Sequence, residues 1–177
     1  MKKVLVLSDS HGYLDNARHV LTRLEGQVEA VAHLGDHDED ARRLAAEFPG
    51  LPFHVVKGNN DYGTDTPNSK RIFCDGRMLL LCHGHKQRVG RNLQTLAYWG
   101  EEQEADVVLF GHTHRAYHGQ WGRQLLFNPG SISLPRDGIT PTFGLLLFDK
   151  GRIEPVIMQY GRDGAFNRQE SSFLGYL

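Results

Sequence analysis

Residues 3–11 read KVLVLSDSH, an apolar, β-branched run that stops at a polar Ser-Asp-Ser-His segment. The apolar part predicts a strand. It is followed by apolar residues at helical spacing, namely Ala17, Val20, Leu21 and Leu24. A second apolar run at 30–34 predicts another strand. An order of strand, helix and strand is typical of a parallel sheet.

The same alternation continues to residue 56 and is then replaced by a different pattern. An amphipathic helix is predicted over residues 41–48, before Pro49-Gly50, and a third strand at 53–56. Asp75-Gly76 lies between two apolar segments, which is the pattern of a β-hairpin with arms at 71–73 and 78–81. The remaining predicted elements are a helix around 93–97 and strands at 107–110, 116–120, 124–127, 142–148 and 153–157.

These elements predict an α/β fold in which two mixed sheets form a β-sandwich flanked by helices. The length of 177 residues suits a single domain over 1–177, with its core at about 3–157. The tail, about 158–177, follows neither period, but its end is apolar at Phe173, Leu174, Tyr176 and Leu177. The tail could pack on the core or on a second copy of the chain, so a homo-oligomer is one alternative.

The charge and hydropathy of the chain limit the classes of partner that we expect. Lys and Arg total 20 and Asp and Glu total 21, so the formal net charge is -1. The lack of a basic stripe disfavours a nucleic acid polymer as partner. The longest apolar runs are far shorter than the roughly 18 residues of a membrane-spanning helix, and the N-terminal run lacks a cleavage site. We therefore expect no membrane partner and a cytoplasmic location.

The sequence contains two cysteines, Cys74 and Cys82, which would lie on opposite arms of the hairpin. In the expected register, Cys74 faces about residue 77 and Cys82 faces about residue 69. That offset of four strand residues, at ~3.3 Å each, exceeds the roughly 7 Å limit for a disulfide. Both cysteines are expected to be free thiols.

Residues that can bind a metal follow five of the predicted strands. Ligands of α/β sheets bind where loops leave the carboxyl ends of the strands. The five segments are Asp9-Ser10-His11, Gly35-Asp36-His37, Gly58-Asn59-Asn60-Asp61, His83-Gly84-His85 and Gly111-His112-Thr113-His114. Carboxylates, an amide oxygen and imidazoles form a mixed set of N and O donors. Such a set suits Mn, Fe, Co, Ni or Zn better than Ca or Mg.

The ordered series Asp-x-His, Gly-Asp, Gly-Asn-x-Asp, His-Gly-His and Gly-His-x-His resembles the calcineurin-like metallophosphoesterase superfamily. The chain is similar to the small prokaryotic phosphodiesterase branch of that family. Members of this branch also carry Asn-Pro-Gly-Ser after the last ligand pair, and this chain has it at 128–131. The resemblance covers roughly residues 3–157. It implies the αββα fold of the family.

The resemblance also implies two divalent metal ions per chain, with Mn first and Ni, Co, Fe or Zn as alternatives. One ion would be held by Asp9, His11, Asp36 and His114, and the second by Asp36, Asn59, His83 and His112. Asp36 would bridge the two ions. The implied activity is hydrolysis of a small phosphoester, foremost a phosphodiester, by attack of a metal-bridging hydroxide. Two ions about 3.5 to 4 Å apart activate water and stabilise charge on the phosphoryl oxygens.

One position departs from the family pattern. Many members have Gly-Asn-His-Asp/Glu, whose histidine is thought to protonate the departing oxygen, and this chain has Asn60 at that position. An amide supplies no useful proton near pH 7. Either the substrate has a good leaving group, or the neighbouring His37 or His85 donates the proton. With Asp36 and Asn59, these two histidines complete the expected catalytic residues.

Other polar residues near the motifs receive more general assignments. Asp61 could orient a nearby histidine or be a solvated turn residue. A basic cluster could bind a substrate phosphate or form solvated surface, and it consists of Lys86, Arg88 and Arg91. Arg115 and Arg136 are left outside the expected site. Four histidines are expected to be hydrogen-bonded structural residues, namely His19, His33, His54 and His118.

Two alternatives to a phosphodiesterase stay open. A eukaryotic retromer subunit has a similar fold, has degenerate metal positions and acts through protein contacts, so a catalytically weak interaction scaffold is one alternative. In this chain every ligand position is filled, which favours catalysis. A phosphomonoesterase or nucleotidase is the other alternative. The protein serine/threonine phosphatase branch is disfavoured because it carries Gly-Asp-x-Val-Asp-Arg-Gly, whereas residues 35–40 read GDHDED.

Overall fold

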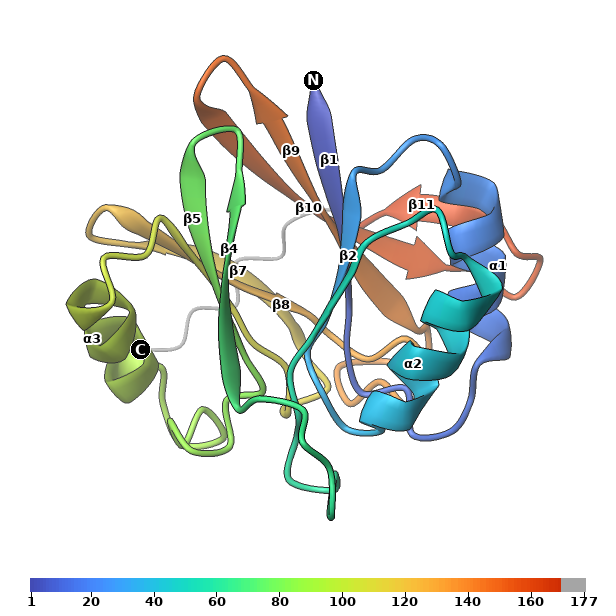
Figure 1. The fold of residues 1–177 in the computed structure, drawn as a ribbon, viewed down its shortest axis with the longest axis horizontal. Helices are drawn as coiled ribbons and strands as arrows, with labels where there is room; N and C mark the ends of the chain where they lie inside the picture. Colours follow the sequence, from blue (N-terminus) through green and yellow to red (C-terminus); the bar gives the residue numbers. More distant parts are fainter. Residues whose placement is uncertain (170–177) are drawn as a thin grey trace.

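Two β-sheets pack face to face in the computed structural model, which describes residues 1–169 (Figure 1). In spatial order, the first sheet consists of β11 (Phe166–Arg168), β10 (Arg152–Tyr160), β9 (Thr142–Asp149), β1 (Lys2–Leu7), β2 (Ala30–His33) and β3 (Phe53–Val55). The second sheet consists of β4 (Ser69–Cys74), β5 (Arg77–Cys82), β6 (Val107–Leu109), β8 (Gln124–Pro129) and β7 (Ala116–Trp121).

Three helices lie outside this sandwich, and they are α1 (Asp15–Leu24), α2 (Asp38–Glu47) and α3 (Gln94–Glu102). Figure 1 shows α1 and α2 against the outer face of the first sheet and α3 against the outer face of the second. Both sheets are mixed. β1 pairs in parallel with β2 and antiparallel with β9, and β5 pairs in parallel with β6 and antiparallel with β4. The predicted two-sheet sandwich with flanking helices is confirmed.

Side chains alternate between the two faces of each strand, and this alternation separates the core between the sheets from the cores beneath the helices. In β1, Val4 and Val6 belong to the core between the two sheets, whereas Leu5 and Leu7 pack in the core beneath α1 and α2. The same period of two recurs in β6, where Val107 and Leu109 face the other sheet. Successive side chains of a strand point to opposite faces, so a run that is apolar at every position fills both cores.

The second outer core is smaller and lies beneath α3. Leu96 and Ala97 of this helix are fully buried and pack with Val108, Phe110 and Leu126. The helix therefore anchors the segment that joins β5 to β6. This segment carries His83 and also contributes to the surface next to the site described below.

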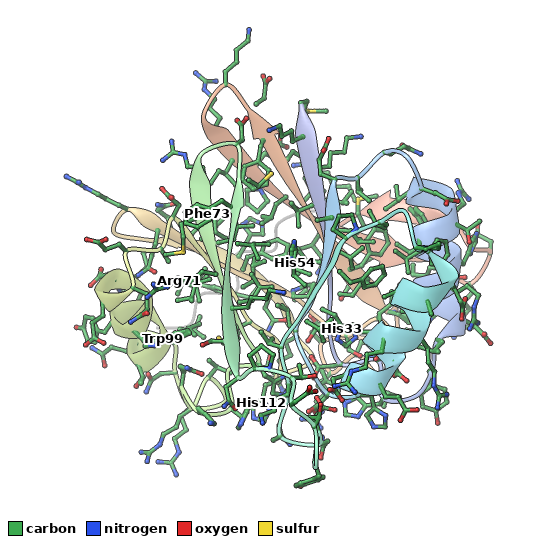
Figure 2. All side chains as sticks on the ribbon, in the orientation of Figure 1. His33, His54, Arg71, Phe73, Trp99 and His112 are labelled. Atoms are coloured by element: carbon green, nitrogen blue, oxygen red, sulfur yellow. The ribbon has the colours of Figure 1, made fainter. Side chains whose placement is uncertain are left out.

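Parallel pairing brings several strand exits to one edge of the sandwich. β1, β2 and β3 are parallel to each other, and so are β5, β6 and β8. The loops after these strands meet at the lower edge of Figure 1, where Figure 2 places His112. The residues singled out by the sequence follow these strands, so the topology gathers them at that edge.

The predicted elements are present, and the differences lie at their ends. α2 begins at Asp38, three residues before its first apolar position, because its first turn is acidic. β11 was not predicted, since its three residues carry no alternating pattern. It pairs with the end of β10, and Phe166 packs into the core beneath α1. The apolar tail residues Phe173, Leu174, Tyr176 and Leu177 lie outside the described residues.

The hairpin of β4 and β5 has the expected register. Cys74 pairs with Arg77 and Cys82 pairs with Ser69, so the two cysteines lie at opposite ends of the hairpin. Both are free, as predicted. Within residues 1–169, no helix combines the length and the apolar character that a bilayer span requires.

Two of the histidines that were assigned to the scaffold are hydrogen-bonded. The His33 ring lies 3.2 Å from the Ser10 hydroxyl, and the His19 ring lies 2.8 Å from the Tyr160 hydroxyl. His54 differs from the expectation, because its Nδ1 atom is buried without a hydrogen-bond partner in the described part of the chain. Burial accordingly lowers the pKa of His54.

Candidate metal centre

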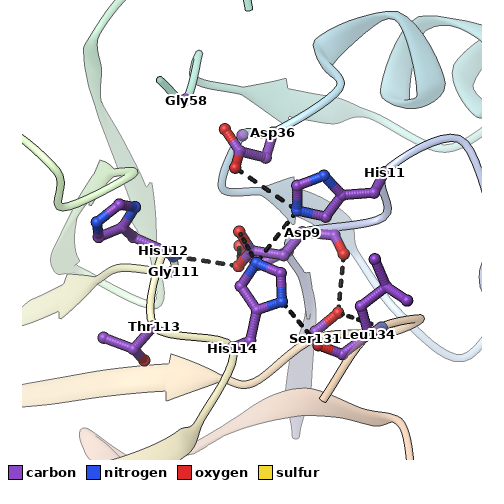
Figure 3. A network of polar contacts seen from close by, with 12 residues as sticks. Asp9, His11, Asp36, Gly58, Gly111, His112, Thr113, His114, Ser131 and Leu134 are labelled. Carbon is purple, nitrogen blue, oxygen red and sulfur yellow. Dashed lines mark hydrogen bonds and ion pairs between the residues drawn. The ribbon is translucent and has the colours of Figure 1, made fainter. Parts of the chain in front are cut away.

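Four side chains from three strand exits come together at the edge of the sandwich (Figure 3). Donor atoms of Asp9, His11, Asp36 and His114 all lie within 4.8 Å of one another. Asp9 and Asp36 are 0% and 2% exposed, respectively. These are the four residues that the sequence assigns to one metal ion. Two carboxylates and two imidazoles form a donor set that suits a divalent transition metal.

The bonding around Asp9 and His114 directs their free atoms into the cluster. Within residues 1–169, Asp9 Oδ1 is buried without a hydrogen-bond partner, and it lies 3.4 Å from His114 Nε2, which in turn lies 3.1 Å from His11 Nε2. His114 Nδ1 donates to the carbonyl of Leu134 at 2.7 Å, which directs Nε2 into the cluster. A metal-binding histidine usually has its second nitrogen held in this way. An orphaned buried carboxylate oxygen is rare in proteins, and a metal ion would satisfy it.

A second group of donors surrounds the other side of Asp36. His83 Nε2 lies 3.4 Å from Asp36 Oδ1 and 3.1 Å from Asn59 Oδ1. His83 Nδ1 donates to the carbonyl of Leu34 at 2.7 Å, so this ring is also held from behind. The ring of His112 lies 5.1 Å from that of His83, measured between centroids. The structure therefore brings together the residues expected for a second ion, with Asp36 between the two groups.

The backbone at these donors is strained. Left-handed φ values occur at five of the donor residues, and they are Asp9 (56°), His11 (48°), Asp36 (54°), His112 (69°) and His114 (56°). Residues other than glycine adopt this conformation at an energetic cost, and they do so most often at functional sites. Because the main chain turns sharply at each donor residue, the side chain points back toward the strand ends and not out to solvent.

Two glycines allow the loops to approach the carboxylates. A Cβ atom on Gly58 would overlap Asp36 Oδ1, and a Cβ atom on Gly111 would overlap the hydroxyl of Ser8 and press on Asp9 Oδ2. Neither glycine has a left-handed φ, so their role is to provide space. The Gly in Gly-Asn-x-Asp and the Gly in Gly-His-x-His thus fit closely against the two buried aspartates.

The Asn-Pro-Gly-Ser segment fastens two of the loops. Ser131 Oγ donates to the carbonyl of Asp9 at 2.8 Å and accepts from the amide of Leu134. Asn128 Nδ2 donates to the carbonyl of Gly111 at 3.0 Å. The sequence analysis used this segment only as a family landmark. Its side chains hold the two donor loops through their backbone carbonyls.

The acidic first turn of α2 fastens the remaining loops. Asp40 Oδ2 accepts from the Ser10 hydroxyl and from the amide of Gly12, both at 2.7 Å. Asp38 Oδ2 accepts from the hydroxyls of Thr64 and Thr66. Neither role was predicted from the sequence. The signal was present in GDHDED, but an acidic run at a helix start is equally typical of a solvated first turn.

Asp61 accepts hydrogen bonds from backbone amides of two loops. Its Oδ1 accepts from the amides of His37 and Asp38 at 2.8 and 2.9 Å, and its Oδ2 accepts from the amide of Gly58 at 2.7 Å. It therefore bonds to the backbone at the start of α2 and to the loop after β3. One of these amides belongs to His37, so Asp61 holds this nearby histidine through its main chain.

The residues considered for proton donation lie beside the donor groups. Asn60 donates from Nδ2 to Asp36 Oδ2 at 2.7 Å, so it holds a carboxylate instead of facing a leaving group. The His37 ring lies 5.4 Å from the His11 ring, between centroids. His85 lies 5.4 Å from His83 and 6.3 Å from His112 by the same measure.

The basic residues near the motifs separate into two groups. Arg91, Arg115 and Arg136 line a cavity that His112 also borders, whereas Lys86 and Arg88 do not line it. The sequence could not reveal this grouping, because these arginines come from three segments that only the fold brings together.

Burial dominates the electrostatics of the metal-free site. It raises the pKa of Asp9 to about 8, against a hydrogen bond from Ser8 that lowers it, and the charge of Asp36 raises it further. Burial also raises the pKa of Asp36, but His83 and the hydrogen bonds from Asn60 outweigh it and hold that pKa below its usual range. Burial lowers the pKa of His83 to about 4. A neutral imidazole is the form that binds a metal.

We predict that Gly58→Ala weakens metal binding while the protein stays folded. The added Cβ would displace the Asp36 carboxylate from its place between the two donor groups. We expect affinity for Mn or Zn to fall by about tenfold to a hundredfold, the range for disturbing the support of a ligand. Titration of the metal-free protein by calorimetry measures this. Gly50→Ala is the matched control, because nothing lies within 4 Å of its Cβ position. Equal affinities of the two variants would contradict the prediction.

We also predict that metal binding near pH 7 releases a proton from Asp9. The metal-free protein holds this carboxyl protonated below about pH 8, whereas a ligand must be a carboxylate. Affinity should therefore rise with pH, by up to about tenfold per unit, and level off above about pH 8. Burial lowers the pKa of His11, His112 and His114, so these rings contribute little to the proton release. Calorimetry in buffers of different ionisation enthalpy counts the released protons, and a count of zero would refute the assignment.

The chain matches a known family over most of its length. The sequence profile of the calcineurin-like phosphoesterase superfamily domain matches residues 1–151. The probable metallophosphoesterase YsnB of Bacillus subtilis is 36% identical over 146 residues, which cover 82% of this chain and 84% of YsnB. The phosphodiesterase YfcE of Escherichia coli is 29% identical over 168 residues, which cover 82% of this chain and 88% of YfcE.

Solved structures share the fold. A predicted phosphoesterase of Streptococcus pneumoniae superposes with a TM-score of 0.77 at 30% identity, covering 94% of this chain and 92% of that chain. Vps29 of Entamoeba histolytica, crystallised with Zn²⁺, gives a TM-score of 0.78 at 23% identity and covers 94% and 97% of the two chains. At that identity the likeness to Vps29 shows the fold alone. This chain belongs to the calcineurin-like phosphoesterase superfamily.

Proposed function

We propose that this chain is a phosphodiesterase that binds two divalent metal ions and hydrolyses a small phosphodiester. The observation that carries the proposal is the position of Asp36. Its Oδ2 lies 3.6 Å from His11 Nε2 in one donor group, and its Oδ1 lies 3.4 Å from His83 Nε2 in the other. A single carboxylate that faces two groups of donors from opposite sides is suited to bridge two cations.

The proposed ligands are those that the sequence assigned. Asp9, His11, Asp36 and His114 would hold one ion, and Asp36, Asn59, His83 and His112 would hold the other. Mn is the first choice, with Ni, Co, Fe or Zn as alternatives, because the donors are oxygens and imidazole nitrogens without a thiolate. Metal ions at this site would lower the pKa of a bound water and stabilise negative charge on the phosphoryl oxygens.

The protein's own contribution is to keep the donors in place and to supply protons. Asn60 donates two hydrogen bonds to Asp36, from its backbone amide at 3.1 Å and from Nδ2 at 2.7 Å, which fix both carboxylate oxygens. Asn60 is therefore occupied and cannot serve as the acid. His37 and His85, which lie beside the two donor groups, are the imidazoles that could deliver a proton to the departing oxygen.

The deciding experiment is to strip the protein of metal and to measure turnover after adding back one metal at a time. The substrates are bis(p-nitrophenyl) phosphate and p-nitrophenyl phosphate, and the metals are Mn, Ni, Co, Zn and Mg. We expect turnover only with metal, a preference for the diester, and a loss on the order of 10³-fold in Asp36→Ala. A preference for the monoester would identify a phosphomonoesterase instead. No turnover by a metal-loaded chain would refute the proposal and favour the interaction scaffold.

Substitution of His37 and of His85 tests which histidine donates the proton. When the histidine that donates the proton is replaced, we expect the loss of activity to depend on the leaving group, because a good leaving group departs without protonation. Replacing the donor by Gln should lower hydrolysis of diphenyl phosphate by about 10²-fold or more, and that of bis(p-nitrophenyl) phosphate by only a few-fold. His118→Gln, in the interior of β7 and outside both donor groups, is the control. Equal losses on both substrates in both variants would exclude the acid role.

A further inference from the structure

A cavity of about 550 Å³ opens beside the candidate metal centre. It lies between residues 89–94, which lead into α3, and the start of β7, and His112 and Thr113 form the wall that it shares with the metal centre. This volume is in the range of pockets that bind small molecules. A substrate held at the metal centre through its phosphate could therefore extend into this cavity.

The charge of the cavity is strongly positive. Arg91, Arg115 and Arg136 line it, and among the described residues no Asp or Glu does. Within residues 1–169, none of these three guanidinium groups forms an ion pair, whereas Arg77 is paired with Asp106. The chain as a whole has a net charge of -1, so three unpaired arginines in one cavity form a local concentration of positive charge. Such a group binds carboxylate or phosphate well.

Aromatic side chains form another part of the cavity lining. Phe110 is 1% exposed and forms part of the floor, and its ring lies 6.3 Å from that of Tyr117, between centroids. Trp121 also lines the cavity, and its ring is held edge-on against Tyr98 at 6.3 Å. Rings held by packing present a fixed apolar surface on which a flat ring can stack.

Arg136 connects the cavity to the metal centre. Its amide donates to the carbonyl of His114 at 2.9 Å, so it belongs to the same loop system as the donors. A ligand that reaches from the metal centre past Arg136 would then meet the aromatic wall and the other two arginines.

We propose that this cavity binds the organic group of the substrate, and that this group combines an aromatic ring with a second anionic group. The ring would stack against Tyr117 or Trp121, with the buried Phe110 ring packed behind Tyr117. The second anion, a carboxylate or a phosphate, would bind Arg91 and Arg115. This inference rests on the proposed phosphodiesterase function, since it specifies the substrate of that same site.

The test compares two phosphonates whose C–P bonds resist hydrolysis, phenylphosphonate and benzene-1,4-diphosphonate. Binding to the metal-loaded protein is followed by calorimetry and by fluorescence in a Trp99→Phe background. The chain has two tryptophans, so Trp121 is then the sole reporter. We expect both ligands to change the Trp121 emission and the diphosphonate to bind about tenfold more tightly, which is the effect of one charge-assisted contact.

The arginines are tested with a pair of variants that change the net charge equally. Arg91→Gln with Arg115→Gln should remove the advantage of the diphosphonate and leave the affinity for phenylphosphonate within about twofold. Arg123→Gln with Arg152→Gln, two exposed arginines outside the cavity, should leave the advantage intact. Equal affinities of the two phosphonates, an unchanged Trp121 emission, or equal effects of the two double variants would overturn the inference.

Hydrolysis of bis(p-nitrophenyl) phosphate by the same preparations separates this inference from the proposed function. Turnover without discrimination between the phosphonates would refute the substrate class and leave the phosphodiesterase proposal intact. Discrimination between the phosphonates without any turnover would refute the phosphodiesterase proposal and keep the cavity as a site for aromatic dianions.

Discussion

Two buried carboxylates at the ends of adjacent parallel strands are the constraint on which the rest of this structure depends. Asp9 follows β1 and Asp36 follows β2, and both are almost completely removed from solvent. Burying two negative charges side by side is costly unless positive charge or hydrogen bonds compensate for it. The metal-free protein meets this cost through protonation at Asp9 and through the hydrogen bonds at Asp36. A pair of divalent cations would meet it directly.

The remainder of the site keeps these carboxylates in position, and it does so mainly through the backbone. Ser131 bonds to the carbonyl of Asp9, Asp40 accepts from the amide of Gly12, and Asp61 accepts from three amides. Except for the bond between Asp61 and the amide of Gly58, which lies within one loop, each of these contacts joins segments that are more than twenty residues apart in the sequence. The donor loops are short and strained, so their shape depends on this network and on the strands behind them. The cavity with its arginines borders the same loops, so the proposed substrate recognition and the proposed metal binding would share one framework.

The sequence predicted the strands, the helices and the donor residues because each depends on local order. Buried strands are continuous apolar runs, and donors directly follow them, so a strand exit identifies both. The roles of Asp38, Asp40 and Asp61 could not be predicted, since an acidic side chain in a first turn or a tight turn has several equally good partners. The cavity was missed for a stronger reason. Arg91, Trp121 and Arg136 belong to three separate segments, and only the packing of α3 and β7 brings them together.

The left-handed backbone at the donor residues costs stability, whereas the side chains at these positions serve the proposed metal site. At His11, His112 and His114, three of the proposed ligands, glycine would relax the main chain and asparagine would ease it, whereas only histidine keeps the proposed imidazole donor. Replacements of this kind would be selected in a screen for heat resistance that ignores turnover. Laboratory evolution of this protein for robustness alone would therefore tend to replace these histidines first, and a stabilised descendant could keep the sandwich while losing the proposed metal donors.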